Sequence, residues 1–507
     1  MRIMYNQQLV NMKNIKSIGS EYEEYLHDES RLTGVAEYLV FARSEEDIRE
    51  TLRFCKDNKF TLTIQGSRTG ITGGSVPEGG LILNLERMNR IRGIRQDENG
   101  NYFLRCEPGL KLAELREILT HRQLDTSDFS PEEHLTWNKF TKAGRYIFPP
   151  DPTETTASLG GMASCNASGA RNLKYGATRQ WISNLKVIRI NEEQSEAILP
   201  DYGERFNFNN VKNAAGYYLG KSARDFEHYI GAEGTLGIIS ELEIKLIRKP
   251  EHCWGVMQFF AGEIAAVNFS EKLRMQKYAA SAIEYFDNNA LDLLRINRQL
   301  WDALPEMQNN WAFGIYYEYE GDDEELLEEA VFSAGELAEE FGSSDSDCWF
   351  VNNDSGIEHL KEFRHAVPEA INEELDKLRR KDNRIAKIST DLAVPDGNLQ
   401  KLLSIYRQAE QSGWRVIVFG HIGNNHLHTN ILPANYAKYL EGRQITESWA
   451  KLAVEMGGSV SGEHGIGKIK RGLLKLMYGS EGMRIFRHVK ELFDPEWLLN
   501  RGNIIER

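Results

Sequence analysis

Four histidines and one glutamate in the C-terminal part of the chain have the types and spacing of a metal site or a proton-transfer site. His421, His426 and His428 fall within eight residues of the segment FGHIGNNHLHTN, and Glu463 and His464 are adjacent in SGEHGIGK. Imidazole and carboxylate groups together can ligate a divalent metal, and imidazole can also act as a base near neutral pH. A set of hydrogen-bonded structural histidines is the alternative.

The strand pattern around the histidines decides whether they can share an ion. Two apolar runs flank a polar centre, which predicts a β-hairpin with Asn424 and Asn425 as its two-residue turn. In that register His421 lies opposite His428, and opposed Cβ atoms are about 4.5–5.5 Å apart, whereas a helix would separate these positions by about 10.5 Å. Glu463 would complete a His₂Glu set, whose open positions suit a catalytic metal acting as a Lewis acid.

The elements that must position these residues alternate between strands and helices. Residues 36–116 combine short strands and amphipathic helices with glycine-rich turns. Residues 251–410 contain strands such as AIEYFD and WAFGIYYEYE between long helices, which is typical of an α+β domain. The polar, weakly periodic stretch at about 120–145 predicts a loop insertion.

Length and composition limit the classes of protein to which this chain can belong. A chain of 507 residues is too long for one hydrophobic core, and its net charge of -14 argues against a non-specific nucleic-acid binder. Five scattered cysteines without a C-x-x-C pair favour neither a disulfide framework nor an iron–sulfur cluster. The N-terminal residues lack the apolar core of a signal peptide, and no apolar run is long enough to span a membrane. We expect a cytoplasmic protein, or one peripheral to the inner membrane face.

A glycine-rich loop follows a predicted strand in TLTIQGSRTGITGGSVP. Backbone amides in such a loop can converge on a pyrophosphate, and the missing side chains allow a ligand to approach closely. The loop is not a Rossmann fingerprint, because G-x-G-x-x-G is absent and no helical pattern follows directly. Taken alone, it could equally be a mobile surface turn.

Three long motifs in order identify a family resemblance. The glycine loop, then PPDPTETTASLGGMASCNASG, then GAEGTLGIISELEI resemble FAD-binding proteins of the vanillyl-alcohol-oxidase (PCMH-type) superfamily, in the branch of D-lactate dehydrogenases, glycolate oxidase large subunits and D-2-hydroxyglutarate dehydrogenases. The resemblance covers residues 30–250 and 355–507. It implies an α+β fold, with a two-subdomain FAD-binding domain and an α+β substrate (cap) domain that contains an antiparallel sheet.

The resemblance also implies domain limits and FAD-binding residues. The limits are an N-terminal extension at 1–35, an FAD-binding domain at 36–250, a cap domain at 251–475, and a C-terminal segment at 476–507 that returns to the FAD domain. The implied FAD-binding residues are Gly66, Ser67, Arg68, Thr69, Gly70, Gly73, Gly74, Ser75, Pro149, Asp151, Thr153, Ser158, Gly160, Gly161, Asn166, Glu233, Gly234, Ile238 and Asn503. The glycine loop has no histidine for a covalent bond to the flavin, so we expect non-covalent FAD.

The same resemblance implies roles around the histidine segment. HIGNNHLH is similar to the branch's H-x-G-D-G-N-x-H pattern, and GEHGIG matches its second signature. By this resemblance His421, His428 and Glu463 bind a divalent metal, with zinc expected, while Asn430 contacts substrate and His464 is the base.

At several other positions the sequence matches the family pattern less closely. Arg364 matches an arginine that clamps the substrate carboxylate, although a helix-surface arginine is the alternative. Lys387 lies two positions earlier than the related lysine, which leaves its role open. Asn424 and Asn425 replace Asp-Gly, and His426 replaces the usual Asn.

The expected activity is oxidation of a D-2-hydroxy acid, of the D-lactate, glycolate or D-2-hydroxyglutarate class, to the 2-oxo acid with hydride transfer to flavin N5. Expected partners are the small acid and an electron acceptor such as a quinone, a cytochrome or an electron-transfer flavoprotein, with no nucleic acid and with a homodimer left open. Two alternatives remain: an oxidase or alkyl-transfer flavoenzyme on the same fold, and a non-catalytic FAD-binding subunit of a redox complex.

Overall fold

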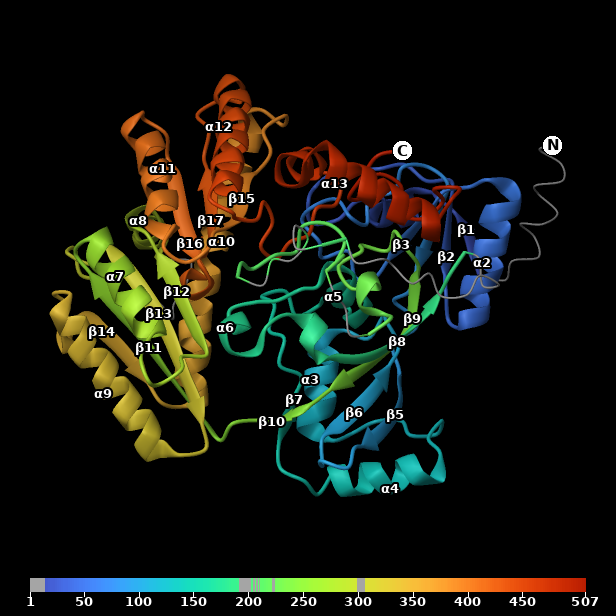
Figure 1. The fold of residues 1–507 in the computed structure, drawn as a ribbon, viewed down its shortest axis with the longest axis horizontal. Helices are drawn as coiled ribbons and strands as arrows, with labels where there is room; N and C mark the ends of the chain where they lie inside the picture. The colour runs from blue at the N-terminus through green and yellow to red at the C-terminus, as the bar shows by residue number, and fades with distance from the viewer. Residues whose placement is uncertain are drawn as a thin grey trace.

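The computed structural model describes residues 14–190, 202–203, 206, 208, 210–220, 224–298 and 306–507. These residues form two lobes that lie side by side, with β1 (Ile15–Ser17) and the C-terminus on the same lobe (Figure 1). None of the helices in the described ranges is long and apolar enough to cross a membrane.

The first lobe contains two four-stranded sheets. In one sheet the order is β1, β2 (Tyr38–Phe41), β4 (Leu81–Asn84) and β3 (Leu62–Gln65), and the last three strands are parallel. The other sheet is antiparallel, in the order β5 (Ile91–Gln96), β6 (Tyr102–Cys106), β9 (Ile238–Lys245) and β8 (Ile182–Ile188). The helices and the remaining strand pair of this lobe are α2 (Glu45–Asn58), α3 (Leu112–His121), α4 (Pro131–Phe140), α5 (Leu159–Cys165), α6 (Asn172–Tyr175), β7 (Tyr146–Ile147) and β10 (Ile247–Arg248).

Local sequence signals explain where α2 begins and ends. The Ser44 hydroxyl accepts a hydrogen bond from the Asp47 amide at the start, and Lys59 takes a left-handed conformation at the end. α2 is the crossover that parallel pairing of β2 with β4 and β3 requires. Because β3 ends at Gln65, the glycine loop begins at the edge of this parallel sheet.

The stretch at 120–145 is not the loop that the sequence predicts, because it contains α4. Ser130 and Glu133 form a capping box, in which each side chain accepts a hydrogen bond from the other residue's amide. Trp137 and Phe140, three residues apart, bury their rings in the core of the first lobe. The capping box and the two buried aromatic residues thus favour a helix here despite the polar composition of the segment.

The second lobe is built on one antiparallel sheet of seven strands. Their order is β14 (Cys348–Val351), β11 (His252–Phe260), β13 (Phe313–Gly321), β12 (Ala282–Phe286), β16 (Val416–Gly420), β17 (His426–Ile431) and β15 (Ile388–Ala393). The helices of this lobe are α7 (Glu263–Arg274), α8 (Asn288–Ile296), α9 (Glu324–Glu340), α10 (Asp354–Lys381), α11 (Leu399–Gln411) and α12 (Tyr436–Glu455). The α+β class with an antiparallel second sheet is confirmed.

Both faces of the central part of this sheet are packed. Val256 and Tyr317 belong to the core cluster that includes α7 and α9, whereas Met257 and Tyr316 belong to the cluster that includes α8 and α10. Alternation along a strand sends successive side chains to opposite faces, which explains why β11 and β13 are buried along most of their length.

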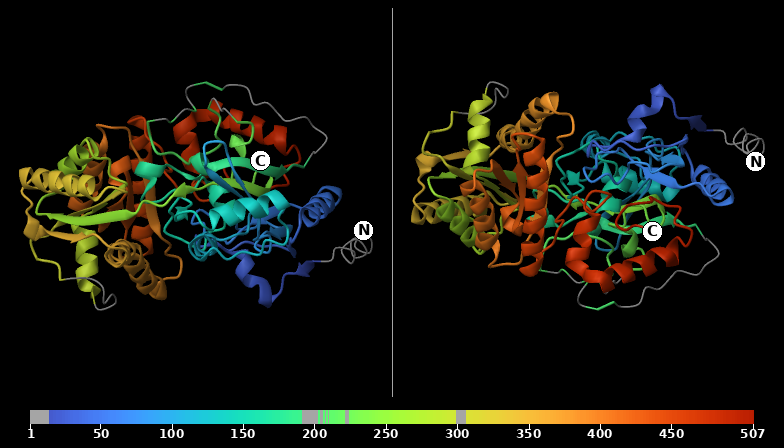
Figure 2. Two further views of the ribbon diagram at one scale, coloured as in Figure 1. Left: turned by 90° about the horizontal axis from the view of Figure 1, so that it is seen from below. Right: turned by 90° about the horizontal axis from the view of Figure 1, so that it is seen from above.

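The chain returns to the first lobe in α13 (Arg471–Phe493), which lies across that lobe in both perpendicular views (Figure 2). Lys490 Nζ donates to the Thr235 carbonyl, and the Tyr478 hydroxyl donates to the Ala215 carbonyl. The segment between α12 and α13 therefore crosses from one lobe to the other, and it carries Glu463 and His464. The domain limits stay predictions.

Candidate active site

The histidine segment forms two strands joined by a connection that is longer than predicted. β16 and β17 pair antiparallel with Phe419 opposite His428, so the predicted register, with His421 opposite His428, is wrong. His421 instead precedes a 3-10 turn at Ile422–Asn424, and Asn425 takes a φ of 49°. A two-residue type I′ turn needs positive φ at both central residues, and here only the second of the two asparagines meets that condition.

The three predicted ligands nevertheless meet. The rings of His421 and His428 have centroids 5.3 Å apart, and Nε2 of each lies 3.1 Å from Oε1 of Glu463. Donor atoms at about 2.0–2.1 Å from a tetrahedral metal are about 3.3 Å from one another. Both Nε2–Oε1 distances therefore suit one shared ion, and metal binding itself stays a prediction.

The edge strand β15 holds the loop that carries Glu463. Ala393 and Ser459 form an isolated β-bridge, and the Gly462 amide donates to the Asp391 carbonyl at 2.8 Å. The loop is thereby aligned with the strand that neighbours β17, which brings Glu463 over the histidines.

The second carboxylate oxygen of Glu463 is held by residues from much earlier in the chain. Lys212 Nζ lies 2.6 Å from Oε2, and the Ser168 hydroxyl donates to the same oxygen at 3.0 Å. Burial opposes ionisation of Glu463, but His421 and Lys212 outweigh it and hold the pKa of this carboxyl well below its usual range. Oε1 is left to face the two imidazoles.

A second carboxylate lies behind His421. Glu284 on β12 is buried, and its Oε1 is 2.6 Å from Nδ1 of His421. Burial opposes protonation of His421, but Glu284 and Glu463 outweigh it and raise the pKa of His421. With Nδ1 bound to Glu284, Nε2 is the nitrogen that points toward Glu463.

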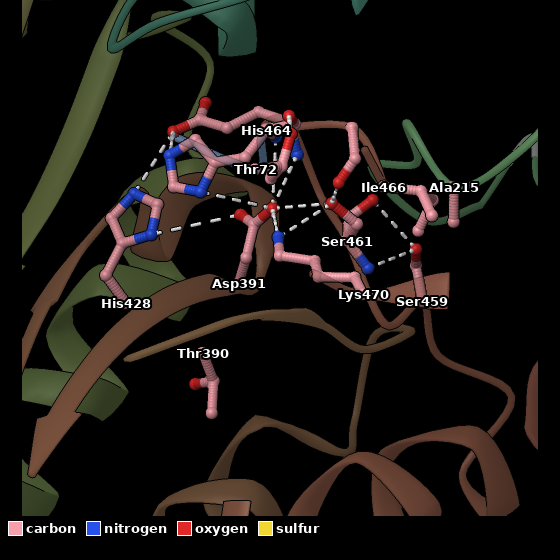
Figure 3. A network of polar contacts seen from close by, with 12 residues as sticks. Thr72, Ala215, Thr390, Asp391, His428, Ser459, Ser461, His464, Ile466 and Lys470 are labelled. Carbon is pink, nitrogen blue, oxygen red and sulfur yellow. Dashed lines mark hydrogen bonds and ion pairs between the residues drawn. The ribbon is translucent and has the colours of Figure 1, made fainter. Parts of the chain in front are cut away.

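His464 lies beside the cluster and keeps an accessible edge. Its ring stacks on His428 with centroids 5.0 Å apart, and its side chain is 27% exposed. Nδ1 is 3.3 Å from Oδ2 of Asp391 (Figure 3). Nε2 is 3.5 Å from Oε1 of Glu463. Burial lowers the pKa of His464 to about 4 although Asp391 opposes this shift. The ring is therefore neutral near pH 7.

Asp391 is the centre of this network, and the sequence analysis missed it. It lies on β15 directly opposite His428, and it accepts hydrogen bonds from Lys470 Nζ at 2.8 Å, the Ser461 hydroxyl at 2.7 Å and the His464 amide at 3.0 Å (Figure 3). Burial opposes its ionisation, but His464 and Lys470 outweigh it and hold the pKa of Asp391 well below its usual range. The feature of the sequence that could have identified Asp391 is its position as a single carboxylate in the mostly apolar segment ISTDLAVP.

Asn430 and Arg364 are both buried near this site. Asn430 is on β17, two positions after His428, and its Oδ1 has no hydrogen-bond partner among the described residues. Arg364 on α10 is 9% exposed, so it is not a surface arginine, and its charge acts on the carboxylate of Glu284. Lys387 is exposed and donates to Asn372, so its role stays open.

The glycine loop at residues 66–75 has unsatisfied donors. Ser67 Oγ and Arg68 Nη1 are buried without a hydrogen-bond partner in the described structure. The loop amides at residues 67–74 donate to no protein acceptor within the described ranges. The free N–H groups of this loop can donate hydrogen bonds to an anionic ligand.

Comparison with known families supports FAD as a cofactor of this chain, and its contact with the glycine loop stays a prediction. A model described as "FAD binding domain" matches residues 36–130, and a model described as "FAD linked oxidases, C-terminal domain" matches residues 249–504. The chain belongs to the FAD-linked oxidase family. The resemblance drawn from the sequence motifs is thus confirmed at the family level.

Relatives of this FAD-linked oxidase extend over nearly its whole length. The D-lactate dehydrogenase of Anaerostipes hadrus is 29% identical over 511 residues, covering 96% of this chain and 94% of the relative. The D-2-hydroxyglutarate dehydrogenase of Xanthomonas citri pv. viticola is 27% identical, covering 100% and 97%. A solved alkyldihydroxyacetonephosphate synthase has a TM-score of 0.65 at 14% identity, covering 98% of this chain and 84% of that one, which shows a shared fold.

The residues of the glycine loop fit an FAD pyrophosphate. The free amides and the orphaned Ser67 hydroxyl supply donors, and a Cβ on Gly70 would meet nothing within 4 Å. Behind the loop, Asn503 donates to the Gly74 carbonyl and Lys468 to the Gly73 carbonyl. The C-terminal part of the chain therefore helps to hold the loop, which contains Thr69 and whose Ser75 also donates to Asp28.

The second motif forms a short helix next to this loop. Ser158 caps α5 by accepting the Gly161 amide, and Gly160 packs against Pro108 so closely that a Cβ would lie 2.6 Å from that ring. Asn166 ends the helix with a φ of 49°. The other predicted residues of this motif, which come just before α5, are Pro149, Asp151 and Thr153.

The third motif ties the two lobes together. Glu233 is fully inside the protein and accepts hydrogen bonds from the amides of Ile466 at 2.7 Å and Gly467 at 2.8 Å. Gly234, with a φ of 70°, packs against Asn500, and Ile238 is the first residue of β9. These contacts fix the loop that carries His464 relative to the FAD-binding lobe, and contact with FAD stays a prediction for these three residues.

Replacing Gly66 tests the loop's role in FAD binding. A Cβ at Gly66 would lie 2.1 Å from Ser158 Oγ, so Gly66→Ala should displace the loop from α5 and lower the flavin content severalfold. The measurement is bound flavin per protein by absorbance after purification with added FAD. Gly335→Ala on α9 meets nothing within 4 Å and serves as the control. Full flavin content in Gly66→Ala would contradict the assignment.

Proposed function

We propose that this member of the FAD-linked oxidase family is a dehydrogenase of D-2-hydroxy acids, of the D-lactate, glycolate or D-2-hydroxyglutarate class. The observation that carries the proposal is the convergence of His421, His428 and Glu463 on one point, with the neutral ring of His464 stacked beside them. The relatives' names as D-lactate and D-2-hydroxyglutarate dehydrogenases support the same substrate class.

The donor set at this point suits a divalent metal. Two imidazole nitrogens and one carboxylate oxygen leave coordination positions open, as in catalytic zinc sites. Glu284 behind His421 supplies the outer hydrogen bond that orients metal-binding histidines. A zinc-like ion held here would polarise the hydroxyl and carboxylate of a chelating 2-hydroxy acid.

His464 is the proposed base, because of how its two nitrogens are placed. Asp391 lies on the Nδ1 side and orients the ring, which leaves Nε2 on the side of Glu463 and the proposed metal ligands. Nε2 can take the hydroxyl proton of a substrate bound there, while FAD supplies the acceptor for the hydride from C2. The product is the 2-oxo acid.

Two further side chains are proposed to bind the substrate. Arg364 offers a buried guanidinium, a group suited to a carboxylate, and Asn430 offers an unpaired amide oxygen. Nη2 of Arg364 lies 3.1 Å from His365 Nε2, whereas Asn430 Oδ1 has no partner among the described residues, and an unpaired buried polar group is costly unless a ligand satisfies it. A second carboxylate on the substrate could also be recognised by such groups.

The test is a panel of D-2-hydroxy acids added to the purified holoenzyme with a dye as electron acceptor. The proposal predicts dye reduction with at least one member of the D series and little with its L enantiomer. Electron transfer to a quinone, cytochrome or flavoprotein predicts slow release of peroxide in air. Rapid stoichiometric peroxide would identify an oxidase instead, and no reduction with any acid would favour a non-catalytic subunit.

A further inference from the structure

His426 is the histidine that the proposed site does not use. It lies on β17 and is completely buried, with its ring centroid 4.7 Å from that of His428 and 5.3 Å from that of His421. Its Nε2 lies 2.6 Å from Oδ1 of Asp391. Its Nδ1 has no hydrogen-bond partner among the described residues.

The contact with Asp391 determines which nitrogen carries the proton. Asp391 already accepts from Lys470, Ser461 and the His464 amide, so it acts as a carboxylate acceptor toward His426 as well. Nε2 of His426 therefore carries the hydrogen, and Nδ1 presents a lone pair in the plane of the ring. A buried lone pair without a donor is costly unless a ligand occupies it.

His421 and His426 share one arrangement. In each, one nitrogen is bound to a buried carboxylate at 2.6 Å, Glu284 for His421 and Asp391 for His426. The other nitrogen of His421 lies 3.1 Å from Oε1 of Glu463, whereas the other nitrogen of His426 has no partner among the described residues. Carboxylates placed in this way fix the tautomer and orientation of histidines that bind metals. One possible ligand atom from each of His421, His426, His428 and Glu463 lies within 4.8 Å of all the others.

We infer that His426 is a fourth protein ligand of the proposed divalent metal, through Nδ1. The inference rests on the proposed function, because it concerns the same site. Four protein ligands together with two oxygens of a chelating 2-hydroxy acid make a six-coordinate site. The site is therefore suited to a divalent ion that adopts six-coordination, and a tetrahedral ion such as zinc has to expand its coordination when substrate binds.

Two substitutions separate this role from a purely structural one. In His426→Gln the side-chain amide reaches the position of Nε2 and can keep the contact with Asp391, but it has no ligand atom at the position of Nδ1. In His426→Asn a polar atom remains near the position of Nδ1, and the contact with Asp391 is lost. A ligand role predicts that Gln is the more harmful change for metal binding, and a structural role predicts the reverse.

The experiment uses the holoenzyme, freed of metal by chelator and titrated with Co²⁺ as the probe. X-ray absorption of the wild-type Co²⁺ protein should count three imidazoles, and His426→Gln should bind Co²⁺ at least about a hundredfold more weakly with a count of two. His359→Gln, an exposed histidine on α10, is the control and should match the wild type. Flavin absorbance reports that each variant is folded.

The outcomes distinguish this inference from the function on which it rests. Two imidazoles in the wild type, or His426→Gln with wild-type Co²⁺ affinity, overturns the fourth ligand while leaving the proposed function intact. A wild-type holoenzyme that oxidises D-2-hydroxy acids after complete metal removal and binds no Co²⁺ overturns the metal site itself, and this inference with it.

Discussion

Replacing His464 with Asn should lower kcat for the best D-2-hydroxy acid by about a thousandfold while FAD stays bound, since general-base catalysis contributes about 10²–10⁴ in rate. The backbone amide of His464 donates to Asp391, and that contact remains in the variant, so the loop should keep its conformation. Asn cannot accept the hydroxyl proton. The measurement is steady-state dye reduction together with flavin content.

The pattern of kinetic constants tests the assignment of the base. Loss of the base predicts a fall in kcat and in kcat/KM of similar size, because the proton transfer belongs to the transition state. His134→Asn on α4 changes an exposed histidine of the first lobe and should leave both constants unchanged. A His464→Asn enzyme with raised KM and wild-type kcat would show a binding role and would contradict the proposed base.

Replacing Glu463 with Gln should abolish metal binding and lower kcat/KM by about three orders of magnitude, because Lewis-acid stabilisation is worth several kcal/mol and 1.36 kcal/mol is tenfold in rate. The neutral amide has the same shape as the carboxylate, but it loses the charge that faces His421 and His428. It also leaves Lys212 without its anion in a buried position, which adds a cost in stability.

The wild type and Glu463→Gln are compared after removal of the metal by chelator and after re-addition of a divalent ion. Chelator should inactivate the wild type, and a divalent ion should restore its activity, whereas the variant should respond to neither treatment. Metal content by elemental analysis and the unfolding midpoint separate loss of the ion from loss of the fold. Wild-type turnover that persists in chelator, with no metal in the protein, would contradict the role of Glu463 as a ligand.

Local patterns predicted the elements that carry the site, and long-range contacts decided its details. The amphipathic helices predicted within residues 36–116 and the strand pattern of AIEYFD are matched by α2 and β12. The hairpin register failed because turn geometry depends on backbone angles at Asn424 and Asn425, which residue type alone does not determine. The residues predicted to meet still did so, because His421 directly follows β16, whose neighbour β17 carries His428, and the two rings have centroids 5.3 Å apart.

The residues that the sequence analysis missed come from distant parts of the chain. Lys212 lies in a segment with no periodic pattern, and Glu284 is one polar residue in an otherwise apolar strand. Asp391 reaches the site only because β15 pairs with β17, a contact that closes a long loop. A buried carboxylate in an apolar strand is a general signal for such partners, because its burial is tolerated only with nearby cations or donors.

The most direct test of the central claim is one anaerobic turnover of the metal-loaded holoenzyme with a single D-2-hydroxy acid. We expect that the flavin absorbance bleaches completely, that one equivalent of 2-oxo acid forms per flavin, and that neither change occurs with the L enantiomer. Flavin that stays oxidised with every D-2-hydroxy acid, or that bleaches without formation of the 2-oxo acid, would contradict the account.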